Sequence, residues 1–252
     1  MDIDSVSKSQ HIASMIFIDK ALRRIGIMLI KAIVIPLKRW IRKLIKKLMY
    51  LLKIDVFYYL YKNSQLSEEG WFRSYFERRP CDLEGKPLPW MTYAFIRFIS
   101  KRINSEMTIF EYGCGSSTLW WADRVQKVIS CEHDKDWYEK MIVNLPDNVQ
   151  LNYISLKYNG EYSKKILEYQ NEFDIIVIDG RDRVNCALNC INALKRDGVI
   201  IWDDTSRSCY QEGYDFLVKH HFKRLDLEGM SPGNLNLSSV SIFYRDNNCV
   251  GL

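Results

Sequence analysis

Residues 108–118 carry the clearest chemical pattern in this 252-residue sequence. An apolar run ends in Glu111, and Gly113 and Gly115 follow with one residue between them. Glycines tolerate unusual φ values and let a ligand approach the backbone, so the stretch predicts a tight turn between a strand and a helix. Glu132, about 20 residues after the turn, is placed to accept hydrogen bonds from the ribose hydroxyls of a nucleoside. We therefore expect a nucleotide-like cofactor at this turn.

The residues around the turn indicate the charge of the ligand. A dinucleotide site would favour a third glycine at position 118, where this chain has Thr118. Glu111 lies two residues before the first glycine, and a carboxylate there suits a positively charged ligand better than a pyrophosphate. A sulfonium with an attached ammonium group is such a ligand. The pattern therefore disfavours a nicotinamide oxidoreductase.

Three acids follow two further apolar runs. Asp179 ends the run 173–178, and Asp203 and Asp204 end the run 198–202. In a doubly wound sheet both strand ends lie at the same carboxyl edge. Three oxygen ligands there suit Mg²⁺ or Mn²⁺. Without a metal, Asp179 or Asp203 could be the general base for a hydroxyl, and Asp203 or Asp204 could instead cap a helix.

Two arginines and a histidine belong to the same region, and each has two interpretations. Arg181 and Arg183 could clamp a carboxylate or phosphate on a substrate, or simply pair with Asp182 and the acids that end the next strand. His133 directly follows Glu132 and could line an adenine pocket or stand in solvent. The residue types alone leave both interpretations open.

Alternating strands and helices must position these residues. Apolar runs of strand length recur at intervals filled by helical patterns, and two late strands are joined by a Gly/Pro/Asn loop. Strands separated by helices imply βαβ units, so we predict an α/β, Rossmann-like, doubly wound, mostly parallel sheet with an antiparallel final hairpin. The expected strands are the one that ends at Glu111 and then 127–131, 149–154, 173–178, 198–202, 222–227 and 238–244.

A basic appendage precedes this domain. The chain has a formal net charge of +5, yet residues 1–60 hold twelve Lys or Arg against four acids. Within 37–53, apolar residues recur at i, i+3 and i+4 with basic residues between them, which predicts a strongly amphipathic helix. The apolar residues are Leu37, Trp40, Ile41, Leu44, Ile45, Leu48 and Met49, and the basic ones are Lys38, Arg39, Arg42, Lys43, Lys46 and Lys47. We therefore divide the chain into a basic amphipathic helical appendage, 1–62, and a main domain, 63–252.

Several partners suit the appendage. An anionic membrane surface would take up the apolar stripe and attract the basic one, whereas a nucleic-acid arm would need a less apolar stripe. The helix could instead pack on the main domain or on a second subunit. No charge-free stretch is long enough for a transmembrane span, and seven scattered cysteines without a CxxC pair indicate a reducing compartment. We expect a cytoplasmic protein, peripheral at the inner face of the membrane if the first interpretation holds.

The glycine turn also carries a family resemblance. The run 111–115, Glu-Tyr-Gly-Cys-Gly, resembles the acid-x-Gly-x-Gly motif of class I S-adenosylmethionine-dependent methyltransferases, and Glu132 matches their ribose-binding acid. Residues 173–180 resemble their fourth strand, and 222–244 resemble their sixth and reversed seventh strands. The chain departs from the family at Ser117, where many members have a third glycine. The resemblance implies an S-adenosylmethionine site formed by Glu111, Gly113, Cys114, Gly115, Ser117, Glu132, His133 and Asp179.

The acids at the two later strand ends resemble those of catechol-type O-methyltransferases, which hold a divalent metal there. Those enzymes carry Asn where Asp204 stands, and this chain lacks a lysine base after Asp179. The resemblance implies a metal set of Asp179, Asp203 and Asp204. The residue types themselves suggest a catalytic set of Asp179, Asp203 and Arg181. The segment 87–93 would either cover the cofactor or pack on the first helix of the domain.

The expected function is O-methylation of a small molecule or a glycan, near a membrane surface. A polyamine-synthase-like aminopropyl transferase shares the fold, but it would need further acids, and the arginines at 181 and 183 argue against a cationic substrate. A non-catalytic, membrane-associated binding protein of the same fold is the third hypothesis. The methyl acceptor and the oligomeric state do not follow from the sequence.

Overall fold

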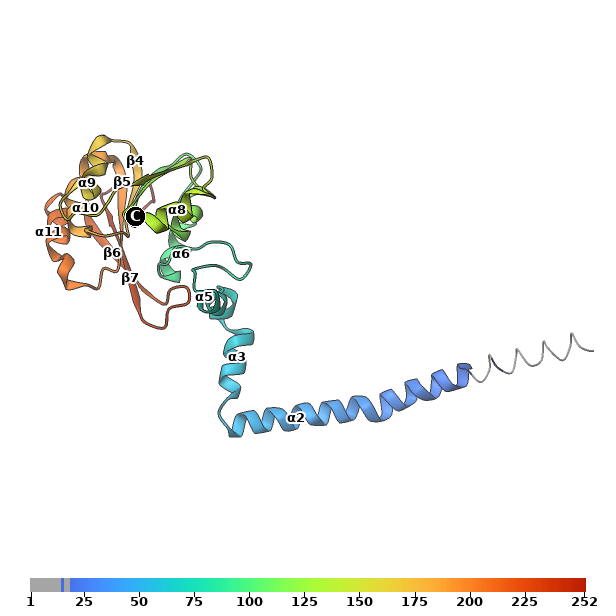
Figure 1. The fold of residues 1–252 in the computed structure, drawn as a ribbon. Coiled ribbons are helices and arrows are strands. Elements are labelled where there is room, and N and C mark those ends of the chain that lie inside the picture. Colours follow the sequence, from blue (N-terminus) through green and yellow to red (C-terminus); the bar gives the residue numbers. More distant parts are fainter. Residues whose placement is uncertain (1–14, 16–18) are drawn as a thin grey trace, which may run out of the picture. The chain divides into compact units, whose positions relative to one another are not determined.

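The computed structural model describes residue 15 and residues 19–252 (Figure 1). The predictions that fall on residues 1–14 and 16–18 lie outside the described residues. The chain divides into two compact units, Met1–Lys62 and Asn63–Leu252. Each unit is described by itself below.

One seven-stranded sheet forms the centre of the second unit. Its strand order is β3-β2-β1-β4-β5-β7-β6, in which β1 to β5 pair in parallel and β7 is antiparallel to both of its neighbours. The predicted doubly wound, mostly parallel sheet with a reversed last strand is therefore confirmed. The strands are β1 (Thr108–Tyr112), β2 (Lys127–Glu132), β3 (Val149–Tyr153), β4 (Phe173–Ile178), β5 (Leu194–Asp203), β6 (Lys223–Gly229) and β7 (Ser238–Tyr244).

The central strand β4 is almost entirely apolar because helices cover both faces of the sheet. On β4 the side chains of Ile175 and Val177 enter one core, and those of Ile176 and Ile178 enter the other. This alternation follows from the two-residue period of a strand. The strand thus places Asp179, the next residue, at the carboxyl edge of the sheet.

Helices form a layer on each face of the sheet. The first core takes side chains from α6 and α7, and the second takes them from α9, α10 and α11, which lie together in Figure 1. Two helix starts are fixed by side-chain caps: Thr92 accepts a hydrogen bond from the Phe95 N–H, and Asp134 accepts one from the Trp137 N–H. The helices are α4 (Gln65–Glu68), α5 (Trp71–Glu77), α6 (Tyr93–Ile99), α7 (Ser116–Ala122), α8 (Lys135–Ile142), α9 (Glu161–Lys164), α10 (Arg183–Cys190) and α11 (Gln211–Lys219), with short 3₁₀ turns at Lys165–Glu168, Ile191–Ala193 and Ser208–Tyr210.

The segment 87–93 packs into the first core. Leu88, Met91 and Tyr93 are buried there, whereas Trp90 is exposed. Of the two alternatives for this segment, packing against the domain is the one that the structure supports. All seven cysteines are free thiols, as the absence of CxxC pairs suggested.

The first unit is helical through its described residues except at 52–54. Residues 19–29 are helical, a π-helical turn follows at Ile30–Val34, and α2 (Ile35–Leu51) and α3 (Asp55–Asn63) complete the unit. Pro36 lacks an N–H and its ring crowds the carbonyl four residues earlier, so a wider turn just before it lets the helix continue. No side chain of α2 is buried in the unit. Within residue 15 and residues 19–252, no helix combines the length and the apolarity that a membrane crossing requires.

Candidate active site

The first glycine turn connects β1 to α7 and touches the loop after β4. Gly113 has φ of +94°, and a Cβ built on it would lie 3.2 Å from the Cα of Gly180. A side chain would therefore be strained by its backbone and would crowd the neighbouring loop. Gly115 differs from the prediction, since its φ of 168° is extended backbone that any residue adopts. A Cβ on Gly115 would meet only the indole of Trp137, at 4.0 Å, so this position is open.

Glu111 is fully buried at the end of β1. Its Oε2 accepts hydrogen bonds from Thr118 Oγ1 at 2.5 Å and from Ser130 Oγ at 3.1 Å. Its Oε1 has no hydrogen-bond partner among the described residues. Burial raises the pKa of Glu111 to about 7, although the nearby hydroxyl groups partly offset the shift. A buried carboxylate with one free oxygen is suited to a cation or an ammonium group.

The partners of Glu111 were not recognised from the sequence. Thr118 entered the sequence argument only as a missing glycine, yet its hydroxyl joins the Gly115 N–H to Glu111. Ser130 pairs with Glu111 in the register of β1 and β2. The available signal was a serine within the apolar strand Lys127–Glu132, which requires a buried hydrogen-bond partner. Ser117 lies inside the first turn of α7, and Gly115 takes the N-cap position of this helix.

Glu132 is fixed at the end of β2 by backbone donors. Its Oε2 accepts from the Cys114 N–H at 3.2 Å, and its Oε1 accepts from the N–H groups of His133 and Asp134 at 2.7 and 2.8 Å. His133 Nδ1 lies 2.8 Å from the same Oε1. These bonds orient Glu132, and its Oε2, which among the described residues accepts only the bond from Cys114, keeps a lone-pair site for a ligand. The indole of Trp137, which the sequence reasoning missed, donates to the Cys114 carbonyl at 2.8 Å and fixes the opposite side of the turn.

A cavity of about 270 Å³ opens between these loops. This volume is slightly below the usual range for small-molecule sites, about 300–1,000 Å³. Six of the eight predicted cofactor residues form its wall, whereas Glu111 and Gly115 do not. The lining residues are Gly113, Cys114, Ser117, Glu132, His133, Asp179, Gly180, Arg181 and Arg183. The structure thus brings together loops that follow β1, β2 and β4.

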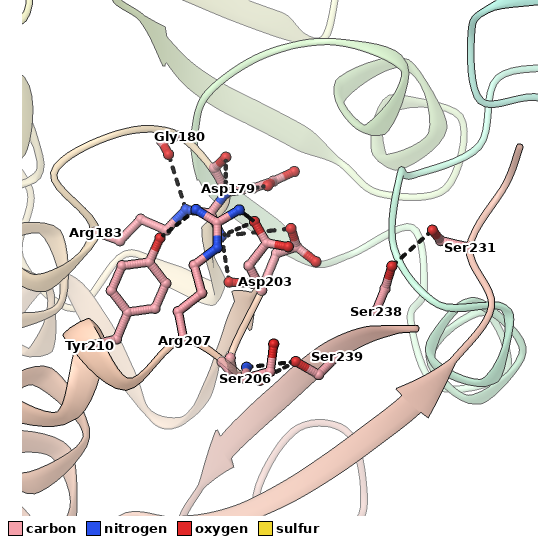
Figure 2. Close-up of polar contacts among 12 residues, drawn as sticks. Asp179, Gly180, Arg183, Asp203, Ser206, Arg207, Tyr210, Ser231, Ser238 and Ser239 are labelled. Atoms are coloured by element: carbon pink, nitrogen blue, oxygen red, sulfur yellow. Dashed lines mark hydrogen bonds and ion pairs between the residues drawn. The ribbon is translucent and has the colours of Figure 1, made fainter. Parts of the chain in front are cut away.

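Arg183 lies at the centre of the acids that follow β4 and β5 (Figure 2). Its guanidinium is 3.2 Å from the Asp179 carboxylate, 3.6 Å from that of Asp203 and 3.4 Å from that of Asp204. It also donates to the carbonyl oxygens of Asp179, Gly180 and Asp203. The side chain is only 8% exposed, so this cation is held inside the protein.

This arrangement corrects the metal prediction for Asp179, Asp203 and Asp204. A guanidinium stands between the three carboxylates, where a divalent ion would need to bind. The described residues contain no group of three His, Cys, Asp or Glu side chains with the geometry of a metal site. Neither Asp203 nor Asp204 caps a helix, because Arg207 and Tyr210 hold the N-cap positions of the two helices that follow. The acids are therefore partners of an arginine.

Asp179 and Asp203 form a pair of interacting carboxyl groups. Burial and the charge of Asp179 raise the pKa of Asp203 well above its usual range. Burial raises the pKa of Asp179 to about 6, while the Arg183 cation opposes that shift. Asp179 keeps 24% of its side chain exposed and lines the cavity, so it is the member that can meet a substrate. At neutral pH the pair can take up one proton at this position.

Arg181 and Asp182 behave differently from Arg183. Asp182 has φ of +52° and accepts hydrogen bonds from the Asn159 N–H at 2.7 Å and from Asn185 Nδ2 at 2.6 Å, so the expected pairing of Asp182 with the arginines is wrong. Arg181 is exposed at the cavity wall. Within the described chain its guanidinium has no ion pair. This side chain is therefore available to a ligand.

No protein-family model matches the chain, and no curated protein matches it in sequence. The fold itself is that of class I S-adenosylmethionine-dependent methyltransferases, since the order β3-β2-β1-β4-β5-β7-β6 with a reversed β7 agrees with the resemblance stated above. Among solved structures, the chain is similar to an O-methyltransferase from Bacillus cereus in complex with SAH, at 19% identity over 55% of this chain and 74% of that one (TM-score 0.45).

Two other solved structures are similar to part of this chain. One is a methyltransferase-like protein from Silicibacter pomeroyi, at 21% identity over 63% of this chain and 89% of that one (TM-score 0.45). The other is a spermidine synthase from Thermotoga maritima, at 16% identity over 61% of this chain and 57% of that one (TM-score 0.43). These likenesses concern the fold, and the activity has to be argued from the site.

Proposed function

We propose that this protein is an S-adenosylmethionine-dependent O-methyltransferase whose acceptor is a small molecule or a glycan. The observation that carries the proposal is Glu111, a buried carboxylate with one oxygen unpartnered, two residues before a glycine turn whose Gly113 and Cys114 line the cavity. Such a group needs a cation, and the cofactor brings both an ammonium group and a sulfonium. The cationic wall at Arg181 disfavours a polyamine substrate and hence the aminopropyl transferase hypothesis.

Each part of the cofactor has a matching group in this chain. The free oxygen of Glu111 would hold the ammonium group, and the backbone of Gly113 to Gly115 would hold the methionine portion. Glu132, oriented by three backbone donors, would accept hydrogen bonds from the ribose hydroxyls. His133 would lie beside the adenine. When bound, the cofactor supplies a methyl group that is already activated, so the protein contributes alignment, exclusion of water and a base.

The base in this proposal is Asp179, supported by Asp203. Asp179 lines the cavity and would accept the proton of the acceptor hydroxyl as the oxygen attacks the methyl group. Asp203 is buried, and its carboxyl group interacts electrostatically with that of Asp179. Arg183 fixes both carboxylates through contacts to their side chains and carbonyl oxygens. No divalent metal enters this scheme.

The helical appendage suggests where in the cell the protein acts. On α2 the apolar side chains of Leu37, Trp40 and Leu44 are half exposed or more, and the six basic residues between 38 and 47 lie on the same helix. This combination suits a surface of anionic lipids, because apolar area enters the interface while the basic side chains remain at the headgroups. We therefore place the acceptor near a membrane.

Calorimetric titration with S-adenosylhomocysteine tests the cofactor site. We expect saturable binding that is weakened at least about tenfold, or 1.4 kcal/mol, by Glu132→Gln. Glu228→Gln, an exposed change on β6, is the matched control and should bind as the natural chain does. A dissociation constant weaker than about 1 mM for the natural chain would overturn the methyltransferase proposal.

Sedimentation with lipid vesicles tests the membrane contact. The full chain should sediment with vesicles of phosphatidylcholine and phosphatidylglycerol, and much less with phosphatidylcholine alone. Leu44→Asp should reduce sedimentation, whereas Leu83→Asp, at a leucine equally exposed in the other unit, should not. Equal sedimentation of the two variants would remove the membrane from the proposal.

A further inference from the structure

A second cavity adjoins the first at the carboxyl edge of the sheet. Its volume is about 390 Å³, within the range for small-molecule sites. The two cavities share a wall made by the loop after β4. The shared residues are Gly180, Arg181 and Arg183, and the second cavity adds Tyr158, Arg207 and Tyr210. A ligand in one cavity would therefore lie next to a ligand in the other.

The three arginines that line this second cavity differ in exposure and in the number of ion pairs that they already form. Arg183 is buried and occupied by the acids after β4 and β5. Arg207 is half exposed, with one nitrogen 2.6 Å from Asp204 and another 3.3 Å from the hydroxyl of Tyr210. Arg181 is exposed and has no ion pair within the described chain. Positive charge thus remains available at the shared wall.

The acids near the cavity do not cancel that charge. The Asp182 carboxylate is held by Asn159 and Asn185. The Asp204 carboxylate pairs with both Arg183 and Arg207. These carboxylates are already partnered, so they do not compete for Arg181.

Aromatic side chains complete the cavity. Tyr158 is 70% exposed at its wall. The ring of Tyr210 lies 5.8 Å from the Arg183 guanidinium and 6.0 Å from that of Arg207. Flat aromatic walls beside arginines suit a ring-shaped ligand that carries an anionic group.

We propose that the second cavity is the acceptor site and that its ligand is a hydroxyl compound bearing an oxyanion, either a carboxylate or a phosphate, which pairs with Arg181. This inference rests on the proposed function, because it takes the adjoining cavity as the cofactor site. The oxyanion at Arg181 would direct the hydroxyl group toward Asp179 in the shared region. Arg207 provides the second cation.

Calorimetric titration of the full chain without cofactor tests the oxyanion site. The probes are inorganic phosphate, benzoate and the uncharged analogue benzamide. We expect phosphate or benzoate to bind, which distinguishes the two oxyanions, and benzamide to bind weakly or not at all. Arg181→Gln should weaken the binding of the anion at least about tenfold. The matched control is Arg196→Gln, which removes an exposed arginine outside both cavities.

Three results would overturn the proposal. These are no saturable binding of either anion up to about 10 mM, saturable binding of benzoate that benzamide equals in affinity, and an Arg181→Gln variant that binds the anion as the natural chain does. Circular dichroism confirms that the variants are folded. Titration of the same samples with S-adenosylhomocysteine separates the two hypotheses. If Arg181→Gln loses anion binding but keeps the binding of S-adenosylhomocysteine, the change affects the acceptor site and not the cofactor site. If the natural chain does not bind S-adenosylhomocysteine, the methyltransferase proposal is refuted independently.

Discussion

Replacing Glu111 by Gln should change how the stability of the protein depends on pH. The carboxyl group is fully buried, and burial raises its pKa from 4.5 to about 7. One pKa unit corresponds to about 1.36 kcal/mol, so the full shift represents about 3.4 kcal/mol. Glutamine has nearly the same shape and keeps an oxygen for Thr118 and Ser130, but it does not ionise.

The direction of this pH dependence follows from proton linkage. The folded protein holds the Glu111 proton more tightly than the unfolded chain does, so this group destabilises the fold as pH rises from about 4.5 to about 7. Below that window both states are protonated, and above it both are ionised. The Gln variant lacks the penalty. Its free energy of unfolding, measured relative to the natural chain, should therefore rise by about 2.5 kcal/mol between pH 5 and pH 8.

Urea unfolding at several pH values measures this difference. Fluorescence of the core tryptophans Trp120 and Trp121 and circular dichroism report the transition. Glu228→Gln serves as the control, because that side chain is exposed on β6 and its replacement should leave the pH dependence unchanged. A change smaller than about 0.7 kcal/mol, half a pKa unit, would refute the buried and ionisable state assigned to Glu111.

Four further predictions follow from the same edge of the sheet. Asp179→Asn should lower the methyl-transfer rate by about 10²–10⁴-fold. The rate of the natural chain should fall as pH decreases through about 6, where Asp179 becomes protonated. A flat pH profile would contradict the role of Asp179 as the base. Arg183→Met should lower the free energy of unfolding by about 3–5 kcal/mol in urea melts, since it leaves buried carboxylates without their cation, and a loss below about 1 kcal/mol would count against that role. Removal of divalent ions with EDTA should leave the rate unchanged, because the Arg183 guanidinium stands between the acids; a rate restored by added Mg²⁺ would reinstate the metal. Gly180→Ala should lower the free energy of unfolding by about 1–3 kcal/mol, because the added Cβ would lie 2.0 Å from the Tyr162 hydroxyl. Tyr162→Phe in the same chain should recover part of that free energy. No recovery would show that the loss comes from the backbone contacts.

Short-range patterns were sufficient to predict the fold. The apolar runs at Phe173–Ile178 and Ser238–Tyr244 coincide with β4 and β7. Such strands can be recognised from their own residue pattern, because burial of the strand requires apolar residues in sequence. The end of β5 was legible in the same way, but its start was not: Leu194–Lys195–Arg196–Asp197 lacks an apolar pattern and joins the sheet only through pairing across an irregular register with β4.

Sequence alone also placed the main elements of the candidate site. The glycine turn and Glu132 are separated by a fixed distance along one βαβ unit, so their meeting at one cavity is a local consequence of the chain. The amphipathic pattern of 37–53 likewise predicted α2, although its partner is not a property of the helix alone.

Only the tertiary structure decided which charges meet. Arg183 and the acids after β5 are about 20 residues apart, and either an arginine pairing or a metal site was compatible with their order. The packing of α10 against β4 and β5 brings the guanidinium between Asp179, Asp203 and Asp204, whereas Arg181, two residues earlier, remains exposed. Side-chain direction changes completely within two residues at the start of a helix. The sequence therefore determined where the glycine turn and the acids lie, and packing alone determined which arginine neutralises the acids and which remains exposed.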